Sequence, residues 1–64
     1  AAYEWRPLDA AGVPWDEWNV EQQAYAVEQY NIELGKMERG EAYDAALLAR
    51  LQPYVEHMRA GPGA

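Results

Sequence analysis

Residues 19–34 read NVEQQAYAVEQYNIEL and carry the clearest helical signal in the chain. Asn19 can cap the exposed N–H groups of a first helical turn, and Gln22 stands three residues later, where it can complete a capping box. Glu21 adds a negative charge where the helix dipole stabilises one. The positions expected on the inner face recur at spacings of four and three, which is the period of an α-helix. They are Val20, Ala24, Val27, Asn31 and Leu34.

The end of this helix is marked by two glycines, either of which can serve as the residue after the C-cap. Gly40 is favoured over Gly35, because Lys36 and Arg39 then lie near the negative end of the helix dipole. The pattern therefore predicts a first helix over about residues 19–39.

A second amphipathic helix is predicted over about residues 41–59. Its apolar stripe continues through Pro53, although a proline inside a helix removes one backbone hydrogen bond and costs about 3 kcal/mol. Two arrangements follow: one bent helix, or a break after Gln52 with Pro53 as the first residue of a third helix. Gly61 is expected to end the helix, and residues 61–64 are predicted to be a disordered tail. The stripe consists of Tyr43, Leu47, Leu51, Tyr54 or Val55, and Met58.

Residues 1–18 hold all three tryptophans and two of the four prolines, and they show no sustained period. This composition predicts an arm with turns that is packed down by its aromatic side chains. Pro14 can open a single helical turn that runs to Trp18, because its missing N–H is no loss at the start of a helix.

The fold class predicted from these segments is all-α: a small helical hairpin or three-helix arrangement, with the Trp-rich arm packed across it. A chain of 64 residues buries only about 60% of its unfolded surface, and without cysteine it has no disulfide to add stability. The aromatic side chains are therefore expected to supply much of the core. The predicted core residues are Trp15, Trp18, Val20, Ala24, Val27, Leu34, Leu47, Leu51, Val55 and Met58.

The charge balance excludes several classes of partner. Eleven acidic and five basic side chains give a formal net charge of −6, which argues against binding to nucleic acid and to anionic lipid. The longest apolar runs are far shorter than the roughly 20 residues of a membrane-spanning helix. The compartment stays open: the bacterial cytoplasm before export, or a secreted location.

Catalytic and metal sites of the common kinds are not expected. The sequence has no Ser, Thr or Cys, so it lacks the ordinary hydroxyl and thiol nucleophiles. His57 is the only histidine and cannot form a zinc site without cysteine, so no metal and no cofactor are predicted. It is instead expected to interact with the dipole at a helix end. One enzymatic alternative remains, a small carboxylate-based hydrolase or carbohydrate-binding domain that uses Glu17, Glu21 and the indoles.

Binding to another protein is the leading interpretation, so the chain is expected not to be an enzyme. Small helical hairpins with many aromatic residues often complete their fold on a partner, and Tyr and Trp are frequent interface anchors. The expected partner is the parent chain, a chaperone or a second copy. An acidic inhibitor of a basic partner is a further alternative. The residues predicted to contact the partner are Tyr3, Trp5, Trp15, Trp18, Tyr25 and Tyr30.

Two motifs carry a resemblance to a known class of proteins. One begins with Tyr3-x-Trp5 and continues as Trp15-x-x-Trp18-Asn19-x-Glu-Gln-Gln-Ala, and the other is Leu51-x-Pro-Tyr-Val-x-x-x-Arg-Ala-Gly. Together they cover about half of the chain, and they resemble helical accessory segments of bacterial secreted effectors and polymorphic toxins, which sometimes accompany zinc-metallopeptidase domains. The chain has no HExxH motif, so peptidase activity is not carried over. The resemblance, together with a first residue that is Ala1 and not Met, implies a fragment of a larger bacterial protein.

Overall fold

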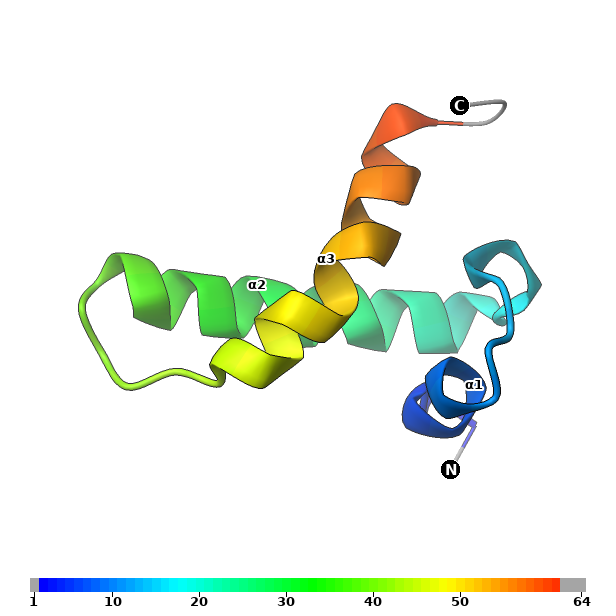
Figure 1. Cartoon of the computed structure of the whole chain (residues 1–64), viewed down its shortest axis with the longest axis horizontal. Coiled ribbons are helices and arrows are strands. Elements are labelled where there is room, and N and C mark those ends of the chain that lie inside the picture. The colour runs from blue at the N-terminus through cyan, green and yellow to red at the C-terminus, as the bar shows by residue number, and fades with distance from the viewer. Residues whose placement is uncertain (1, 62–64) are drawn as a thin grey trace.

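The chain folds into helices joined by short turns. Within residues 2–61, which are the residues that the computed structural model describes, there are three α-helices, one 3₁₀ turn and no strand (Figure 1). The elements are α1 (Arg6–Ala10), η1 (Trp15–Glu17), α2 (Val20–Glu38) and α3 (Ala45–Ala60). The predicted all-α fold class is confirmed.

The start of α2 has the predicted capping box. The backbone N–H of Gln22 donates to Oδ1 of Asn19 at 2.7 Å, and the backbone N–H of Asn19 donates to Oε1 of Gln22 at 2.8 Å. The same two side chains also hold the N-terminal segment, since their amide nitrogens donate to the carbonyl oxygens of Ala2 (3.1 Å) and Glu4 (3.3 Å). The cap therefore fixes the arm as well as the helix.

The helix α2 ends at Glu38 with Arg39 as its C-cap, so Gly40 and not Gly35 is the residue after the C-cap, as predicted. Gly40 has φ +76°, a backbone conformation that glycine adopts without a steric penalty. Its N–H donates to the carbonyl of Met37 at 3.1 Å, and the N–H of Glu41 donates to the carbonyl of Lys36 at 2.9 Å. This pair of bonds is a Schellman motif, and it satisfies carbonyl groups that the helix end would otherwise leave unpaired.

The helix α3 begins at Ala45, four residues later than the predicted start at 41. The prediction was wrong because Glu41 is used to close α2 and is not available for a new helix. Asp44 is the actual cap, and its carboxylate accepts the N–H of Leu47 at 3.0 Å. The N–H of Asp44 in turn donates to Oε1 of Glu33 at 2.8 Å, which ties the start of α3 to α2.

The contribution of the loop between α2 and α3 to stability should therefore depend on pH through the carboxyl group of Glu33. The backbone N–H of Asp44 and the ammonium group of Lys36 lower the pKa of the Glu33 carboxyl. A lowered folded-state pKa adds stability above the unfolded-state pKa of about 4.5, and this stability is lost as the pH falls through the folded-state pKa. In thermal melts from pH 7 to pH 3, the advantage of the wild type over Glu33→Gln should shrink below about pH 4.5. Glu38→Gln is the matched control on the same helix, and an equal shrinkage there would contradict the assignment.

The helix α3 continues through Pro53, which settles the two alternatives in favour of one bent helix. Figure 1 shows that α3 lies over α2 near the loop, changes direction about half-way along, and then points away from α2. A proline cannot donate to the carbonyl four residues before it, and its ring pushes that carbonyl aside, so a bend at this place is expected. Gly61 is the C-cap residue, and residues 62–64 of the predicted tail lie outside the described residues.

The N-terminal segment is more regular than predicted. Its first helix, α1, was not expected, because five residues are too few to show a period. Pro7 stands in its first turn, where the missing N–H is no loss, and was a signal that the prediction did not use. Gly12 ends α1 with φ +73° and the same pair of bonds as Gly40. The helical turn predicted between Pro14 and Trp18 is present as η1.

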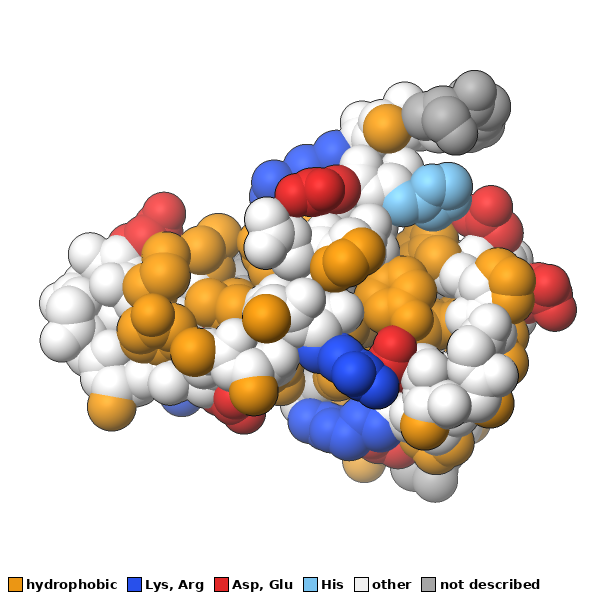
Figure 2. Space-filling model, in the orientation of Figure 1, with side chains coloured by type: hydrophobic (Ala, Val, Ile, Leu, Met, Phe, Trp, Pro, Cys, Tyr) orange, Lys and Arg blue, Asp and Glu red, His pale blue; other side chains and the backbone are white. Residues whose placement is uncertain are grey.

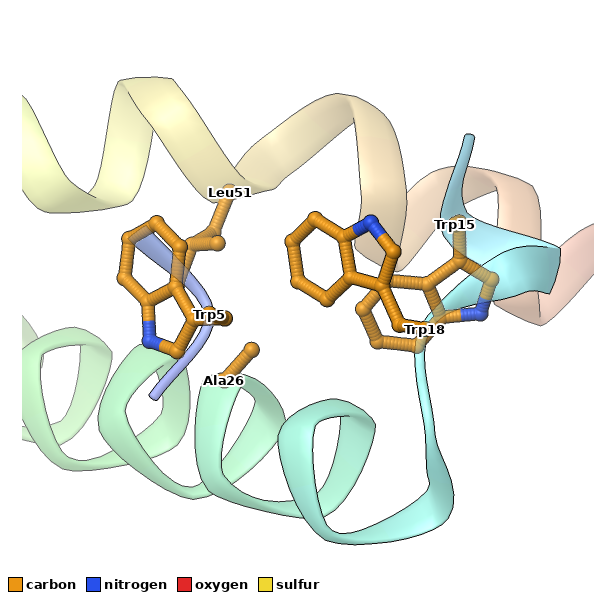
Figure 3. Packing of buried hydrophobic residues seen from close by; sticks show 5 residues of the cluster. All are labelled: Trp5, Trp15, Trp18, Ala26 and Leu51. Atoms are coloured by element: carbon orange, nitrogen blue, oxygen red, sulfur yellow. The ribbon is translucent and has the colours of Figure 1, made fainter. Parts of the chain in front are cut away.

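The core is built from the indoles, which lie between α2 and α3 (Figure 3). The picture shows Ala26 of α2 and Leu51 of α3 pointing toward Trp5 from opposite sides. Ala26 was not predicted to be buried, yet a small side chain is what leaves room for an indole at this point. The buried hydrophobic residues are Trp5, Trp15, Trp18, Ala26, Leu51 and Val55.

The predicted core was correct in its centre and wrong at its ends. Trp15, Trp18, Leu51 and Val55 are buried, as expected. Val27, Leu34 and Leu47 are only half-buried. Val20, Ala24 and Met58 are exposed, contrary to the prediction, because α3 crosses α2 and then bends away, so that the first turns of α2 and the last turns of α3 do not meet.

Leu51 is fully buried, and its removal should be the most costly aliphatic truncation in the chain. Leu51→Ala is expected to cost about 2–5 kcal/mol of unfolding free energy, because the cavity lies between helix and indole and cannot collapse easily. Urea denaturation followed by circular dichroism measures this loss. The half-buried neighbour Leu48 gives the control, and an equal cost for Leu48→Ala would show that the centre of the core has been misplaced.

Candidate functional site

The three tryptophans and Tyr54 form one aromatic cluster. The rings of Trp5 and Trp18 are nearly parallel with centroids 6.2 Å apart, and Trp15 lies 5.0 Å from Trp18. Tyr54 of α3 packs on Trp18 at 4.8 Å and on Trp15 at 5.8 Å. The cluster thus joins the arm, η1 and α3 in a single contact, with a geometry that favours aromatic pairs.

This cluster changes the role of the tryptophans that were predicted to bind a partner. Trp5 is 3% exposed and Trp18 is 4% exposed, so they have almost no surface left to bury against another protein. Their indole N–H groups are also used internally, by the side-chain carbonyl of Gln29 at 2.8 Å and the backbone carbonyl of Val13 at 2.9 Å. In this fold Trp5 and Trp18 are therefore core residues that present almost no surface to a partner. Trp15 is buried too, but it lines a groove.

The predicted tyrosines are placed in two different environments. Tyr3 is about half exposed, and its ring meets that of Tyr25 edge to face with centroids 4.8 Å apart. Together with Glu21 and Glu28 they line a shallow hollow on α2. Tyr30 lies farther along α2 and packs partly against the core. Tyr3 and Tyr25 are thus the two predicted interface residues that the structure brings together at the surface.

An open apolar groove lies where α2 and α3 diverge. Its volume is about 480 Å³. Val20 at its edge is 79% exposed, and Met58 on the opposite wall is 41% exposed. Both residues were predicted to lie in the core, but the structure leaves them exposed at this groove. The groove is lined by Trp15, Val20, Gln23, Ala24, Val27, Glu28 and Met58.

The 3₁₀ turn η1, which places Trp15 in the groove, is held in place by side chains of both α2 and α3. The side-chain amide of Gln23 in α2 donates to the backbone carbonyl of Trp15 at 3.0 Å. On the other side, Nε2 of His57 in α3 lies 3.4 Å from both carboxylate oxygens of Asp16 in η1. Figure 2 shows this imidazole beside an acidic side chain at the edge of the molecule. His57 therefore faces a carboxylate, in addition to its expected place near the helix end.

The acidic side chains are unevenly neutralised. Four basic residues of the described part form ion pairs, and all four pairs lie away from the groove: Arg6–Glu4, Arg50–Asp9, Lys36–Glu33 and Arg39–Glu41. The fifth, Arg59, is in the last turn of α3 and does not line the groove. Within residues 2–61, seven acids make no ion pair with Lys or Arg: Glu38, Asp44 and Glu56, which do not line the groove, and Asp16, Glu17, Glu21 and Glu28. The last four of these acids lie on η1 and the first half of α2.

A second polar cluster fastens α1 to α3. The hydroxyl of Tyr54 donates to Oδ1 of Asp9 at 2.6 Å, and Nε of Arg50 donates to the other carboxylate oxygen. The side chain of Asp9 is only 12% exposed. The hydrogen bond to Asp9, together with burial, raises the pKa of the Tyr54 phenol, because both favour its neutral form. The phenol is thus held as a hydrogen-bond donor, and the cluster has a structural role.

No metal or membrane site is found in the part of the chain that the structure describes. Residues 2–61 contain no group of three His, Asp or Glu side chains placed to hold a metal ion. None of their helices has both the length and the apolar character required to cross a bilayer. Glu17 and Glu21, the carboxylates of the hydrolase alternative, are both exposed, and Glu21 borders the hollow beside Tyr3 and Tyr25. The groove is therefore the strongest candidate for a functional site.

Comparison of the chain with protein-family models, with curated proteins and with solved structures gives no match.

The Asp9 cluster should make stability fall in alkali. Because the folded-state pKa of Tyr54 is raised above the ordinary value of 10.0, its contribution is fully present below pH 10.0 and is lost as the pH rises through the folded-state pKa. Tyr54→Phe keeps the ring that packs on Trp18 and removes only the hydroxyl. In urea melts, the advantage of the wild type over Tyr54→Phe should be constant from pH 7 to 9 and should decrease above pH 10. An advantage that grows with pH would contradict this assignment.

Proposed function

We propose that this chain is a non-catalytic helical protein-interaction module, and that the groove between α2 and α3 is its docking site. The observation that carries the proposal is the exposure of Val20 and Met58, which face one hollow from two different helices. Burying one such side chain fully is worth about 1.5–3 kcal/mol. A partner that covers both would therefore gain a large part of the free energy of a micromolar complex.

The groove is also suited to binding because its walls are already in place. The capping box fixes the first turn of α2, and Gln23 holds the backbone of Trp15 against that helix. A preformed site loses little conformational entropy when a partner binds, so more of the contact energy remains as affinity. The width of the groove depends on the indoles between the helices and does not need the partner to create it.

An apolar stripe on a partner helix is the occupant that the walls fit best. Two divergent helices offer a trough between them, and a helix seated in a trough presents anchors at spacings of three and four residues. Val20, Ala24 and Val27 follow the same spacing on α2, so they can interdigitate with such anchors.

The proposed link to bacterial secreted effectors rests on the two sequence motifs alone. In this structure the motif residues have local structural roles: Trp15 and Trp18 fill the core, and Asn19 caps α2. The same residues are therefore expected in any chain with this core and cap. A larger bacterial parent protein stays a prediction.

Replacing the exposed groove residues should weaken docking without unfolding the chain. The probe is a synthetic amphipathic helix of about 18 residues with a Leu and Ala stripe and equal numbers of Lys and Glu on its other face. Val20→Gln and Met58→Gln should each reduce its affinity about fivefold or more. Binding is followed by NMR, in which the indole signal of Trp15 should shift more than that of Trp5.

Met37 gives a matched control, since it is exposed to the same 41% as Met58 and does not line the groove. Met37→Gln should leave the affinity unchanged. Absence of binding to the neutral peptide, or an equal loss with Met37→Gln, would contradict the proposed site.

A further inference from the structure

We propose that the natural occupant of the groove is an amphipathic protein helix whose apolar stripe is flanked by Lys and Arg, an inference that rests on the proposed function. The apolar lining explains why a helix binds, but it does not select among helices. The selection comes from the carboxylates beside the groove, since no described Lys or Arg lines it.

The acidic rim is a property of the folded chain and not only of its composition. Four of the five basic residues are paired with acids that do not line the groove. Three further acids without a Lys or Arg partner, Glu38, Asp44 and Glu56, do not line it either, so what distinguishes the groove is that it carries carboxylates while no described Lys or Arg lines it. Asp16 marks one edge of this rim, with its side chain 78% exposed, and Glu28 lines the groove itself.

The acidic rim is continuous with the surface formed by Tyr3 and Tyr25. Ala24 and Glu28 line both the groove and the neighbouring hollow, so the two form one surface along α2. In that hollow, two carboxylates stand beside two aromatic rings. A Lys or Arg beside the apolar stripe of a partner would meet carboxylates at salt-bridge range and ring faces suited to cation–π contact.

A second copy of the chain is a poor occupant by the same argument. Each copy carries a net charge of −6, and a symmetric contact through the groove would bring two acidic rims together. Juxtaposed like charges at an interface are strongly unfavourable. The charge distribution thus favours a different, basic chain.

The test compares three synthetic peptides of about 18 residues that share one Leu and Ala stripe and differ only in the flanking residues: Lys, Gln or Glu. At low salt the Lys peptide should bind about tenfold more tightly than the Gln peptide, and the Glu peptide should bind most weakly. In about 0.5 M salt the three affinities should converge on that of the Gln peptide, because the charges are then screened. Isothermal titration and the Trp15 indole signal report affinity and location.

Two substitutions assign the effect to the rim. Glu21→Gln and Glu28→Gln should each reduce the ratio of the Lys-peptide affinity to the Gln-peptide affinity about threefold. Glu38→Gln removes an equal charge in the last turn of α2, away from the groove, and should have no such effect.

The outcomes separate the two proposals. If the Gln peptide binds in the groove and the Lys and Glu peptides bind equally well, the docking site stands and the basic partner is wrong. If Glu38→Gln acts as strongly as Glu28→Gln, the preference reflects net charge only, and the assignment to the rim is wrong. If no peptide binds, the docking site itself is wrong. If sedimentation shows a dimer that is lost when Val20 is replaced, the occupant of the groove is a second copy of the chain, and the proposal of a basic partner helix is wrong.

Discussion

The indoles of Trp5 and Trp18 stand between α2 and α3, and the shape of the chain depends on the space they occupy (Figure 3). Directly packed helices have axes about 8–10 Å apart, which leaves no room for an indole. The hairpin therefore closes near the loop, where Glu33 binds the backbone of Asp44, and opens toward the tryptophans. At the open end, the N-terminal arm fills part of the space between the two helices, and the part that stays unfilled is the groove.

The groove results from two features: the wedge formed by the indoles of Trp5 and Trp18 between the helices, and the bend of α3 at Pro53. An unbent α3 that lay alongside α2 would bring the last turn of α3 over residues 23–26 of α2. The wedge and the bend prevent this contact, so the ends of two regular apolar stripes stay in solvent. Chains this short cannot easily leave apolar surface unused, because their stability is marginal. Stability alone does not explain why the ends of these two apolar stripes are exposed.

Local chemistry was predicted well and long-range geometry was not. The cap at Asn19 and the stops at Gly40 and Gly61 depend on residues within four or five positions, so the sequence contains the whole signal. The burial of Trp5 and Ala26 depends on which segment enters between the helices, and no local pattern records that. Periodicity identifies an apolar stripe but does not say whether a helix of the same chain covers it.

The same difference between local signals and long-range geometry explains why the groove at the candidate site was not predicted. Residue types predicted that aromatic side chains would face a partner, yet the tryptophans became the core and the aliphatic ends became the exposed surface. The net charge was visible in the composition, but which acids lie beside the groove was not, because that depends on how α2, η1 and α3 are placed in the fold. Four of the five basic residues pair with acids that do not line the groove, so the carboxylates beside the groove have no Lys or Arg partner among the described residues. Hydrophobic burial would set the affinity of such a site, and the unpaired acids would decide which helices reach it.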